Sequence, residues 1–311
     1  MFGIRKQRNI LPNMRVSKSL LIIMVGLLFF AKGNVMARPD PLKFNRGQIA
    51  DLTFDEDSKS QFIYDMGIAL ANGDIPNMFC VDKFGENDNV SQNQDNDIWD
   101  LGGIYPFLTE ATVLTISSST STDEASNTGA RTVKVFTLDD TWSFASQIAT
   151  MNGQSVFTLG SQMRVYRAFV DDAGSNNGAE ATIHIGFGTI TAGVPANRLA
   201  ILTPESNQTL MAIMSVPSNH FGYIKRWYVG FDGITGTARF GNVNLCSVKN
   251  GLIRRIRRKQ GIATDVAPHQ ESFYMPIRIE EKQDVLLMMN NASVNNLSVS
   301  GGFDMVFIKK T

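Results

Sequence analysis

Short apolar runs alternate with clusters of glycine, asparagine, aspartate and serine from residue 111 to the C-terminus. The runs are rich in valine, isoleucine and aromatic residues, and no amphipathic helix separates them. This pattern is typical of antiparallel sandwiches or barrels and not of a parallel α/β sheet. We therefore predict a mainly β chain with antiparallel, jelly-roll-like β-sandwich domains. The expected strands are 111–117, 131–138, 163–170, 181–187, 208–216, 222–230, 237–245, 273–279, 284–290 and 302–310.

One segment before these runs has the periodicity of a helix. Ser58 and Gln61 fit a capping box, in which each side chain satisfies an open backbone amide. Gly73 is placed to end the helix. We predict one amphipathic helix, whose apolar face is formed by Phe62, Ile63, Met66, Ala69 and Leu70. The polar segment 84–97 that follows is predicted to be a loop.

These elements suggest four regions along the chain. Residues 1–37 form a leader, and residues 38–97 form an N-terminal arm with the helix. A first β-sandwich domain is expected over 98–203 and a second over 204–311. The boundary between them is placed where Gly193, Pro195 and Pro204 interrupt the strand patterns.

The leader has two interpretations. Its apolar run, 20–31, follows Arg15 and Lys18 and precedes small residues that suit signal peptidase cleavage after Ala37. A run of twelve residues is too short for a transmembrane helix, which needs about 20. The first interpretation is an export signal. The second is upstream sequence translated in frame, with the native protein starting at Met36, and we expect this second one.

The net charge of zero conceals an uneven distribution. Residues 1–35 carry six basic residues and no acidic one, which leaves 23 basic against 29 acidic residues in the rest, a net charge of −6. Residues 51–100 alone hold twelve acids and two basic residues. An acidic body argues against nucleic acid as a partner of the whole surface.

One basic run stands out within this acidic body. It places six positive charges in eleven residues, at Lys249, Arg254, Arg255, Arg257, Arg258 and Lys259. In a strand, Arg254, Ile256 and Arg258 would share one face, and neither face would resemble a core. We expect an exposed hairpin or edge strand. Three roles remain open: a solvated edge, a contact with the acidic 51–100 region of a neighbouring subunit, and binding of an anionic polymer such as nucleic acid, lipopolysaccharide or another glycan.

The residues that usually carry catalysis or bind metals do not form a site in the sequence. The three histidines, at 184, 220 and 269, lack the spacing of metal ligands and are expected to be structural. The carboxylate doublets 139–140, 171–172 and 280–281 end strand patterns, where neighbouring side chains point to opposite faces. We therefore predict a protein that is not an enzyme and has no cofactor, metal or small-molecule substrate.

Three aspartates and the two cysteines form two further sets of candidate residues. Asp95, Asp97 and Asp100 could bind calcium, but the loop lacks the glycine and closing glutamate of an EF-hand. Cys80 and Cys246 are expected to be buried free thiols, although one disulfide in an oxidising compartment stays open.

Five segments together resemble a group of β-rich virion structural proteins of tailed bacteriophages, which are frequent among marine phages. They are MGIALANGDIPNMFCVDKFGENDNVSQNQDNDIWDLGGIYPF (66–107), GARTVKVFTLDDTW (129–142), RVYRAFVDDAG (164–174), QTLMAIMSVPSNHFGYIKRW (208–227) and PIRIEEKQD (276–284). The resemblance runs from about residue 60 to the C-terminus and does not reach the leader.

The resemblance implies a non-enzymatic virion component on the capsid surface, the neck or the tail, assembled in the host cytoplasm. Its partners would be further copies of itself and other virion proteins, with a host surface glycan possible. The candidate core or interface anchors are Trp99, Tyr105, Phe107, Trp142, Trp227 and Tyr228. The alternative is a secreted or cell-surface β-sandwich protein for adhesion or glycan binding, which requires a genuine leader.

Overall fold

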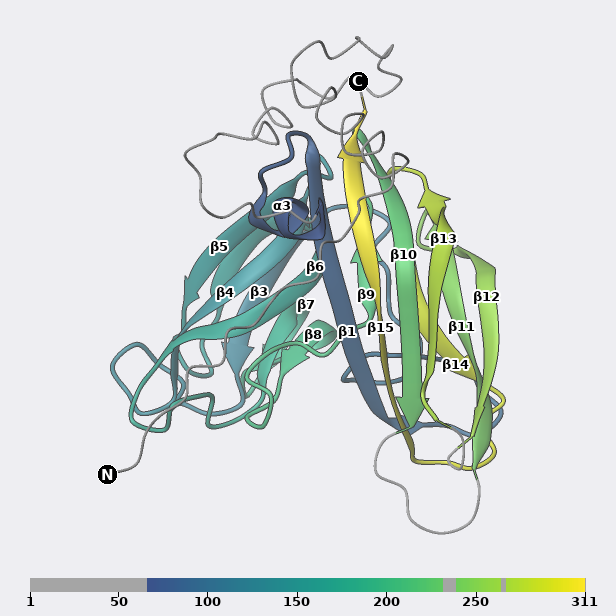
Figure 1. Ribbon diagram of the computed structural model, residues 1–311. Coiled ribbons are helices and arrows are strands. Elements are labelled where there is room, and N and C mark those ends of the chain that lie inside the picture. Colours follow the sequence, from purple (N-terminus) through teal and green to yellow (C-terminus); the bar gives the residue numbers. More distant parts are fainter. Residues whose placement is uncertain (1–65, 232–238, 264–266, 311) are drawn as a thin grey trace, which may run out of the picture. The chain divides into compact units, whose positions relative to one another are not determined.

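The structure is a computed structural model that describes residues 66–231, 239–263 and 267–310 (Figure 1). Three antiparallel sheets and one short helix make up this part of the chain, which confirms the prediction of a mainly β fold. No helix among the described residues is long and apolar enough to cross a membrane. The leader and most of the arm, with Met36 and the predicted helix start at Ser58, lie outside the described residues.

The first sheet has six strands in the order β5-β4-β6-β3-β7-β8. Its strands are β3 (Thr112–Ser118), β4 (Ala130–Asp139), β5 (Phe144–Thr150), β6 (Phe157–Ala173), β7 (Ile183–Thr191) and β8 (Val194–Leu202). Gly193 and Pro195, two of the residues used to place the domain boundary, lie in the β7–β8 hairpin. Ala192 and Gly193 both have positive φ angles, 48° and 78°, as a two-residue type I′ turn requires.

The second and third sheets are built mainly from the C-terminal part of the chain. A four-stranded sheet has the order β1-β15-β10-β13, and a five-stranded sheet has the order β12-β11-β14-β2, with β9 also pairing with β14. The four-stranded sheet contains β1 (Met78–Val90), β10 (His220–Phe231), β13 (His269–Ile279) and β15 (Leu297–Lys309). The five-stranded sheet contains β2 (Asn96–Asp97), β9 (Ile213–Ser215), β11 (Phe240–Lys249), β12 (Ile253–Ala263) and β14 (Gln283–Asn290).

Both faces of the five-stranded sheet are buried. Cys246, Val248 and Met288 belong to the core shared with the six-stranded sheet. Val243 and Leu287, on the opposite face, belong to the core shared with the four-stranded sheet. This explains why β14 has an almost continuous apolar sequence instead of an alternating one, since a strand covered on both faces needs apolar residues at every position.

The segment predicted as a polar loop, 84–97, was assigned wrongly for most of its length. Phe84–Val90 continues β1, which pairs with β15, and the segment ends in β2. The inward positions of β1 are Lys83, Gly85 and Asn87, so the strand has no apolar alternation to signal it. Gly85 is required by packing, because a Cβ there would lie 2.1 Å from the backbone nitrogen of Ala212. The division into domains stays a prediction. Within it, the predicted arm 38–97 contributes two strands, β1 and β2, to sheets whose other strands come later in the chain.

The described part of the helix is α3, Met66–Asn72. It ends as predicted at Gly73, whose φ is 78°. Gly73 N–H donates to the Leu70 carbonyl and Asp74 N–H to the Ala69 carbonyl, which is a Schellman motif. Leu70 is buried, Ile68 is exposed, and α3 packs against β1.

Candidate assembly surface

Five of the six residues of the basic run lie on β12, at the end of the five-stranded sheet, and Lys249 is the last residue of its partner strand β11 (Figure 1). The residues of β12 alternate poorly between exposed and half-buried positions, and only Ile262 near its end is buried. Such a composition suits an edge, because charged side chains stay hydrated there and discourage unwanted strand pairing. The structure therefore places all five basic residues from Arg254 to Lys259 on an edge strand.

A β-bulge changes which of these residues share a face. Ile256 is opposite Cys246 and Arg258 is opposite Leu245, so Arg257 is an extra residue in β12. The extra residue reverses the alternation beyond it. Arg254 and Ile256 therefore lie on the face of Cys246, whereas Arg258 lies on the opposite face with Leu245. The prediction that Arg254 and Arg258 share a face was wrong, because the sequence carries no signal of the bulge.

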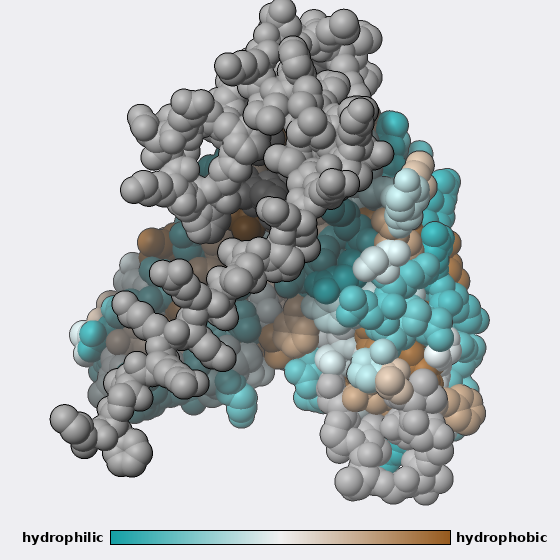
Figure 2. All heavy atoms as spheres, viewed as in Figure 1, coloured by the Kyte–Doolittle hydropathy of each residue, from teal (hydrophilic) through white to brown (hydrophobic). Residues whose placement is uncertain are grey.

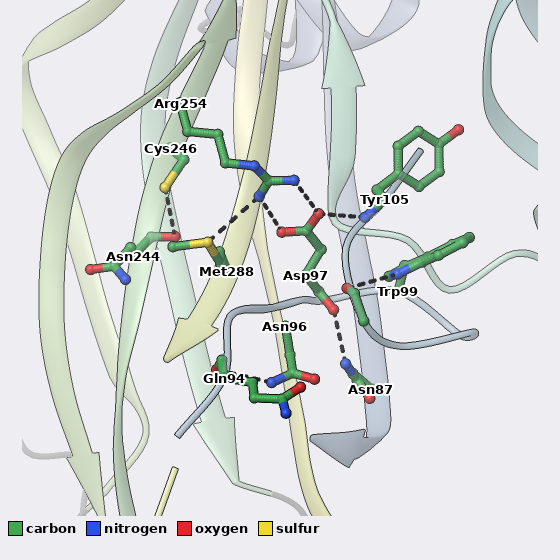
Figure 3. A network of polar contacts seen from close by, with 11 residues as sticks. Asn87, Gln94, Asn96, Asp97, Trp99, Tyr105, Asn244, Cys246, Arg254 and Met288 are labelled. Atoms are coloured by element: carbon green, nitrogen blue, oxygen red, sulfur yellow. Dashed lines mark hydrogen bonds and ion pairs between the residues drawn. The ribbon is translucent and has the colours of Figure 1, made fainter. Parts of the chain in front are cut away.

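Arg254 is held by an ion pair within the chain (Figure 3). Its two terminal nitrogens donate to the two carboxylate oxygens of Asp97 over 2.5 and 2.7 Å. Asp97 is fully buried and also accepts the Tyr105 backbone N–H over 2.7 Å. Burial raises the pKa of Asp97, and the Arg254 guanidinium opposes that rise. Arg254 is therefore paired with an acidic residue of the 51–100 region, but that residue, Asp97, belongs to the same chain and not to a neighbouring subunit.

The remaining basic residues of β12 are less constrained. Arg258 lies 3.5 Å from a carboxylate oxygen of Glu271 and over the ring of Phe273, both on β13. Arg257 donates to the Ser247 hydroxyl over 2.8 Å. Arg255 and Lys259 are exposed. The Arg258 contacts connect the edge of the five-stranded sheet to the edge of the four-stranded sheet, so the two edges form one continuous surface.

Exposed apolar side chains gather on the same two edges. The pairing of β10 with β13 is interrupted so that residues 273–276 oppose Lys225 alone. This bulge projects Tyr274, which is 98% exposed, and Met275, which is 77% exposed. Brown and tan spheres also interrupt the hydrophilic surface over the β10–β13 side of the molecule (Figure 2). Four of the twelve exposed large apolar residues of the described chain lie on β12 and β13: Ile253, Ile256, Tyr274 and Met275.

The aromatic candidates lie elsewhere. Trp99 and Tyr105 are buried in the core shared by the six- and five-stranded sheets, and Trp227 is buried in the other core. Tyr228 is half-buried on β10, with the Arg226 guanidinium 5.4 Å from its ring centroid. None of these residues belongs to the β12–β13 surface, and a role as interface anchors stays a prediction.

Phe107 and Trp142 support a buried arginine. The Arg164 guanidinium carbon lies 5.2 Å from the Phe107 ring centroid and 4.8 Å from that of Trp142. Arg164 Nε and Nη2 donate to the Asp284 carboxylate over 2.8 and 3.0 Å. The Ser215 hydroxyl also donates to Asp284, which is fully buried. Because Arg164 is on β6 and Asp284 on β14, this pair joins the six-stranded sheet to the five-stranded sheet.

The other candidates have structural surroundings. His184 is buried beside the Ser119 hydroxyl, 2.8 Å from its Nε2, and burial lowers its pKa to about 4. Both cysteines are free, but Cys80 is exposed, so the expectation of two buried thiols holds only for Cys246. No group of three potential metal ligands occurs within the described ranges.

Two ionisable groups, the buried Lys83 and the half-buried Asp100, were missed by sequence reasoning. Lys83 on β1 donates to the Tyr166 carbonyl of β6, and burial lowers its pKa to about 7, with Arg167 adding to the effect. Asp100 accepts the Leu210 backbone N–H over 2.7 Å. Burial raises the pKa of Asp100 to about 8, and the backbone hydrogen bond opposes this rise. Nothing local in the sequence distinguishes these residues from exposed charges.

These shifts predict opposite pH dependences. Asp100 keeps its proton in the folded state up to about pH 8, whereas the unfolded chain releases it near 4, so its contribution to stability is lost as pH rises between them. Lys83 has a lowered pKa, so its contribution rises with pH from about 7 to about 10. We expect Asp100→Asn to remove a loss of about 2 kcal/mol between pH 5.5 and pH 7.0, at about 1.4 kcal/mol for each pH unit. Urea unfolding at both pH values measures it, and parallel pH profiles for the two proteins would contradict the assignment.

The comparisons with known proteins show only weak similarity. No family model and no curated protein sequence matches the chain. A structure of infectious bursal disease virus, Gx strain, is 10% identical, with 74% of this chain and 72% of that chain covered and a TM-score of 0.20. The T13 particle of the same virus is 8% identical, with 76% and 71% covered and a TM-score of 0.22. These weak neighbours are virion proteins of an animal virus and not of a tailed bacteriophage. Superpositions at this level do not show a shared fold.

Proposed function

We propose that this chain is a non-enzymatic structural protein of a tailed-bacteriophage virion, located on the capsid surface, the neck or the tail. It assembles as a homo-oligomer through the edges of its sheets. The resemblance in the sequence supports the virion assignment. The observation that carries the assembly role is the concentration of exposed apolar residues on the adjoining edges β12 and β13.

An exposed apolar edge is a liability for a monomer. Its unpaired backbone groups and side chains such as Ile256, Tyr274 and Met275 favour association with another chain. A stable interface buries about 800 Å² on each partner, with aromatic residues, methionine and arginine enriched in it. The β12–β13 surface has this composition, since it presents Tyr274 and Met275 beside the arginines of β12.

The buried carboxylates support a structural role over a catalytic one. Asp97 and Asp284 each hold an arginine in a bidentate pair, with further donors on the same oxygens. Groups satisfied in this way stabilise the fold and have no free oxygen to act as a general base.

Substitution of one edge residue tests the assembly role. We expect Ile256→Asp to weaken self-association by at least about ten-fold, because it places a charge in the apolar part of the interface. Light scattering after gel filtration over a range of concentrations measures the change. Ile148→Asp is the matched control, since Ile148 is 54% exposed on β5 and Ile256 is 55% exposed on β12. Equal effects of the two substitutions, or a wild-type chain that stays monomeric, would contradict assembly through β12.

The virion assignment has its own test. Mass spectrometry of purified particles is expected to detect peptides of the described chain in a constant ratio to the other structural proteins. A virion role would be excluded if a phage encodes this chain but its purified particles contain none of the peptides of the chain. The same spectra would identify the N-terminal residue of the native protein.

A further inference from the structure

We propose that β12 accepts a strand from a second copy of this chain, formed by the acidic segment 49–57. The inference rests on the proposed function, because it assigns the contact through which copies meet. The added strand would extend the five-stranded sheet and bring carboxylates next to Arg255, Arg257 and Lys259.

The edge strands of the described chain differ in charge, and this difference selects β12. The edge strand β5 has no ionisable residue, and the edge strand β8 has one arginine. The edge β1 has more acidic than basic residues, and β13 holds Glu271 and Arg278 in equal number. Only β12 among the described edges is strongly positive, with five basic residues and no acid between 253 and 263. A strand that pairs here must be acidic.

Two of the five charges on β12 already have partners in the chain. Asp97 holds Arg254, and Glu271 lies beside Arg258. Arg257 donates to a neutral hydroxyl, that of Ser247. Arg255 and Lys259 are exposed and have no ion pair among the described residues. Three positive charges at the edge are therefore available to an incoming strand.

The segment 49–57, IADLTFDED, has the complementary pattern. It contains four acids and no basic residue. In an extended conformation its side chains alternate, with Ala50, Leu52 and Phe54 on one side and Asp51, Thr53 and Asp55 on the other. The apolar side can cover Ile256, which is 55% exposed, and Glu56 on that same side can meet Lys259. The acidic side meets Arg255 and Arg257 on the opposite face. Nine extended residues span about 30 Å, which is close to the length of the eleven-residue β12.

The position where the described chain begins favours a second copy as the donor. α3 packs on β1, and β1 is three strands away from β13 in the four-stranded sheet. The route from β1 to β12 thus crosses about 14 Å of sheet and the further 10 Å or so between packed sheets. We therefore assign the donor strand to a second copy, because exchange between two chains needs no route across these sheets.

Charge reversal in two separate chains tests the contact. One variant reverses the segment, D51K/D55K/E56K, and the other reverses the edge, R255E/R257E/K259E. Each variant alone is expected to self-associate at least about ten-fold more weakly than the wild type. An equimolar mixture is expected to recover assembly, because each reversed group then meets its opposite charge on the other chain. Light scattering after gel filtration measures association, and circular dichroism confirms folding of both variants, which retain Arg254 and Arg258.

The outcomes separate this inference from the proposed function. An R167E/R198E/K309E variant changes the charge by the same amount at exposed positions outside β12 and β13 and is expected to assemble normally. Recovery only when both reversals are in one chain, and not in the mixture, would show a contact within the chain and overturn the inference. Unchanged assembly of both reversed variants would also overturn it while leaving assembly itself intact. A monomeric wild-type chain would instead contradict the proposed function.

Discussion

Replacing Arg164 with methionine is expected to lower the free energy of unfolding by about 3–5 kcal/mol. The substitution leaves the fully buried Asp284 carboxylate without its bidentate partner, and only the Ser215 hydroxyl remains as a side-chain donor to it. It also removes the hydrogen bonds from Arg164 to the Leu108 and Met163 carbonyls, each 2.7 Å long. An uncompensated buried charge is among the few single changes that cost this much.

Arg167→Met is the matched control for this substitution. Arg167 lies on the same strand, β6, but is exposed, and we expect its replacement to change stability by less than about 0.5 kcal/mol. Urea unfolding measures both variants. The double variant Arg164→Met with Asp284→Leu should recover part of the loss, since it removes both charges together. A cost for Arg164→Met no larger than that for Arg167→Met would contradict the role of the pair.

Replacing Asp97 with alanine is expected to cost about 3–4 kcal/mol and to release β12 from the rest of its sheet. The change leaves the Arg254 guanidinium and the Tyr105 N–H without their acceptor. Since Arg254 is only 22% exposed, its charge cannot simply turn into solvent without moving the strand. We therefore expect faster amide hydrogen exchange in β12 than in β11, in addition to the lower stability.

Asp95→Ala is the control for Asp97, because Asp95 is exposed two residues earlier in the same acidic segment. We expect wild-type stability and wild-type exchange in β12 for this variant. Exchange measured by mass spectrometry on both variants distinguishes a local effect on β12 from general destabilisation. Equal acceleration in β12 and in the distant strand β5 would show that Asp97 has no specific role at the basic edge.

The sequence predicted where individual strands lie better than it predicted which strands pair with each other. Period-two alternation and turn residues identified β3, β4, β10 and β14 to within two residues at each end, and located β6, β7, β11 and β15 with larger errors at their ends. The β1 strand was missed because Lys83, Gly85 and Asn87 fill its inward positions, where a sequence pattern expects apolar side chains. The β8 strand was missed because Pro195 and the glycine before it look like a break. In both cases, a partner strand distant in the sequence satisfies the backbone.

The candidate surface was predicted in part. The basic run pointed to an edge, and the structure places it at one. The apolar bulge of β13 was not anticipated, although a proline after Tyr274 and Met275 breaks the alternation there, as a bulge on an edge strand does. The Asp97–Arg254 pair joins residues 157 positions apart, so no local pattern could have shown it.

The sequence by itself determined that this chain is a mainly β protein with antiparallel pairing, an end of the helix at Gly73 and a positive strand in an acidic body. These features depend on local alternation, turn chemistry and charge, which act over a few residues. Only the tertiary structure decided which arginines of that strand are available. Arg254 is bound to a buried aspartate, whereas Arg255 and Lys259 remain exposed. One extra residue, Arg257, moves Arg258 to the face opposite Arg254. That choice depends on the register between β11 and β12 and on a carboxylate brought in by β2, and both arise only when distant segments pack together.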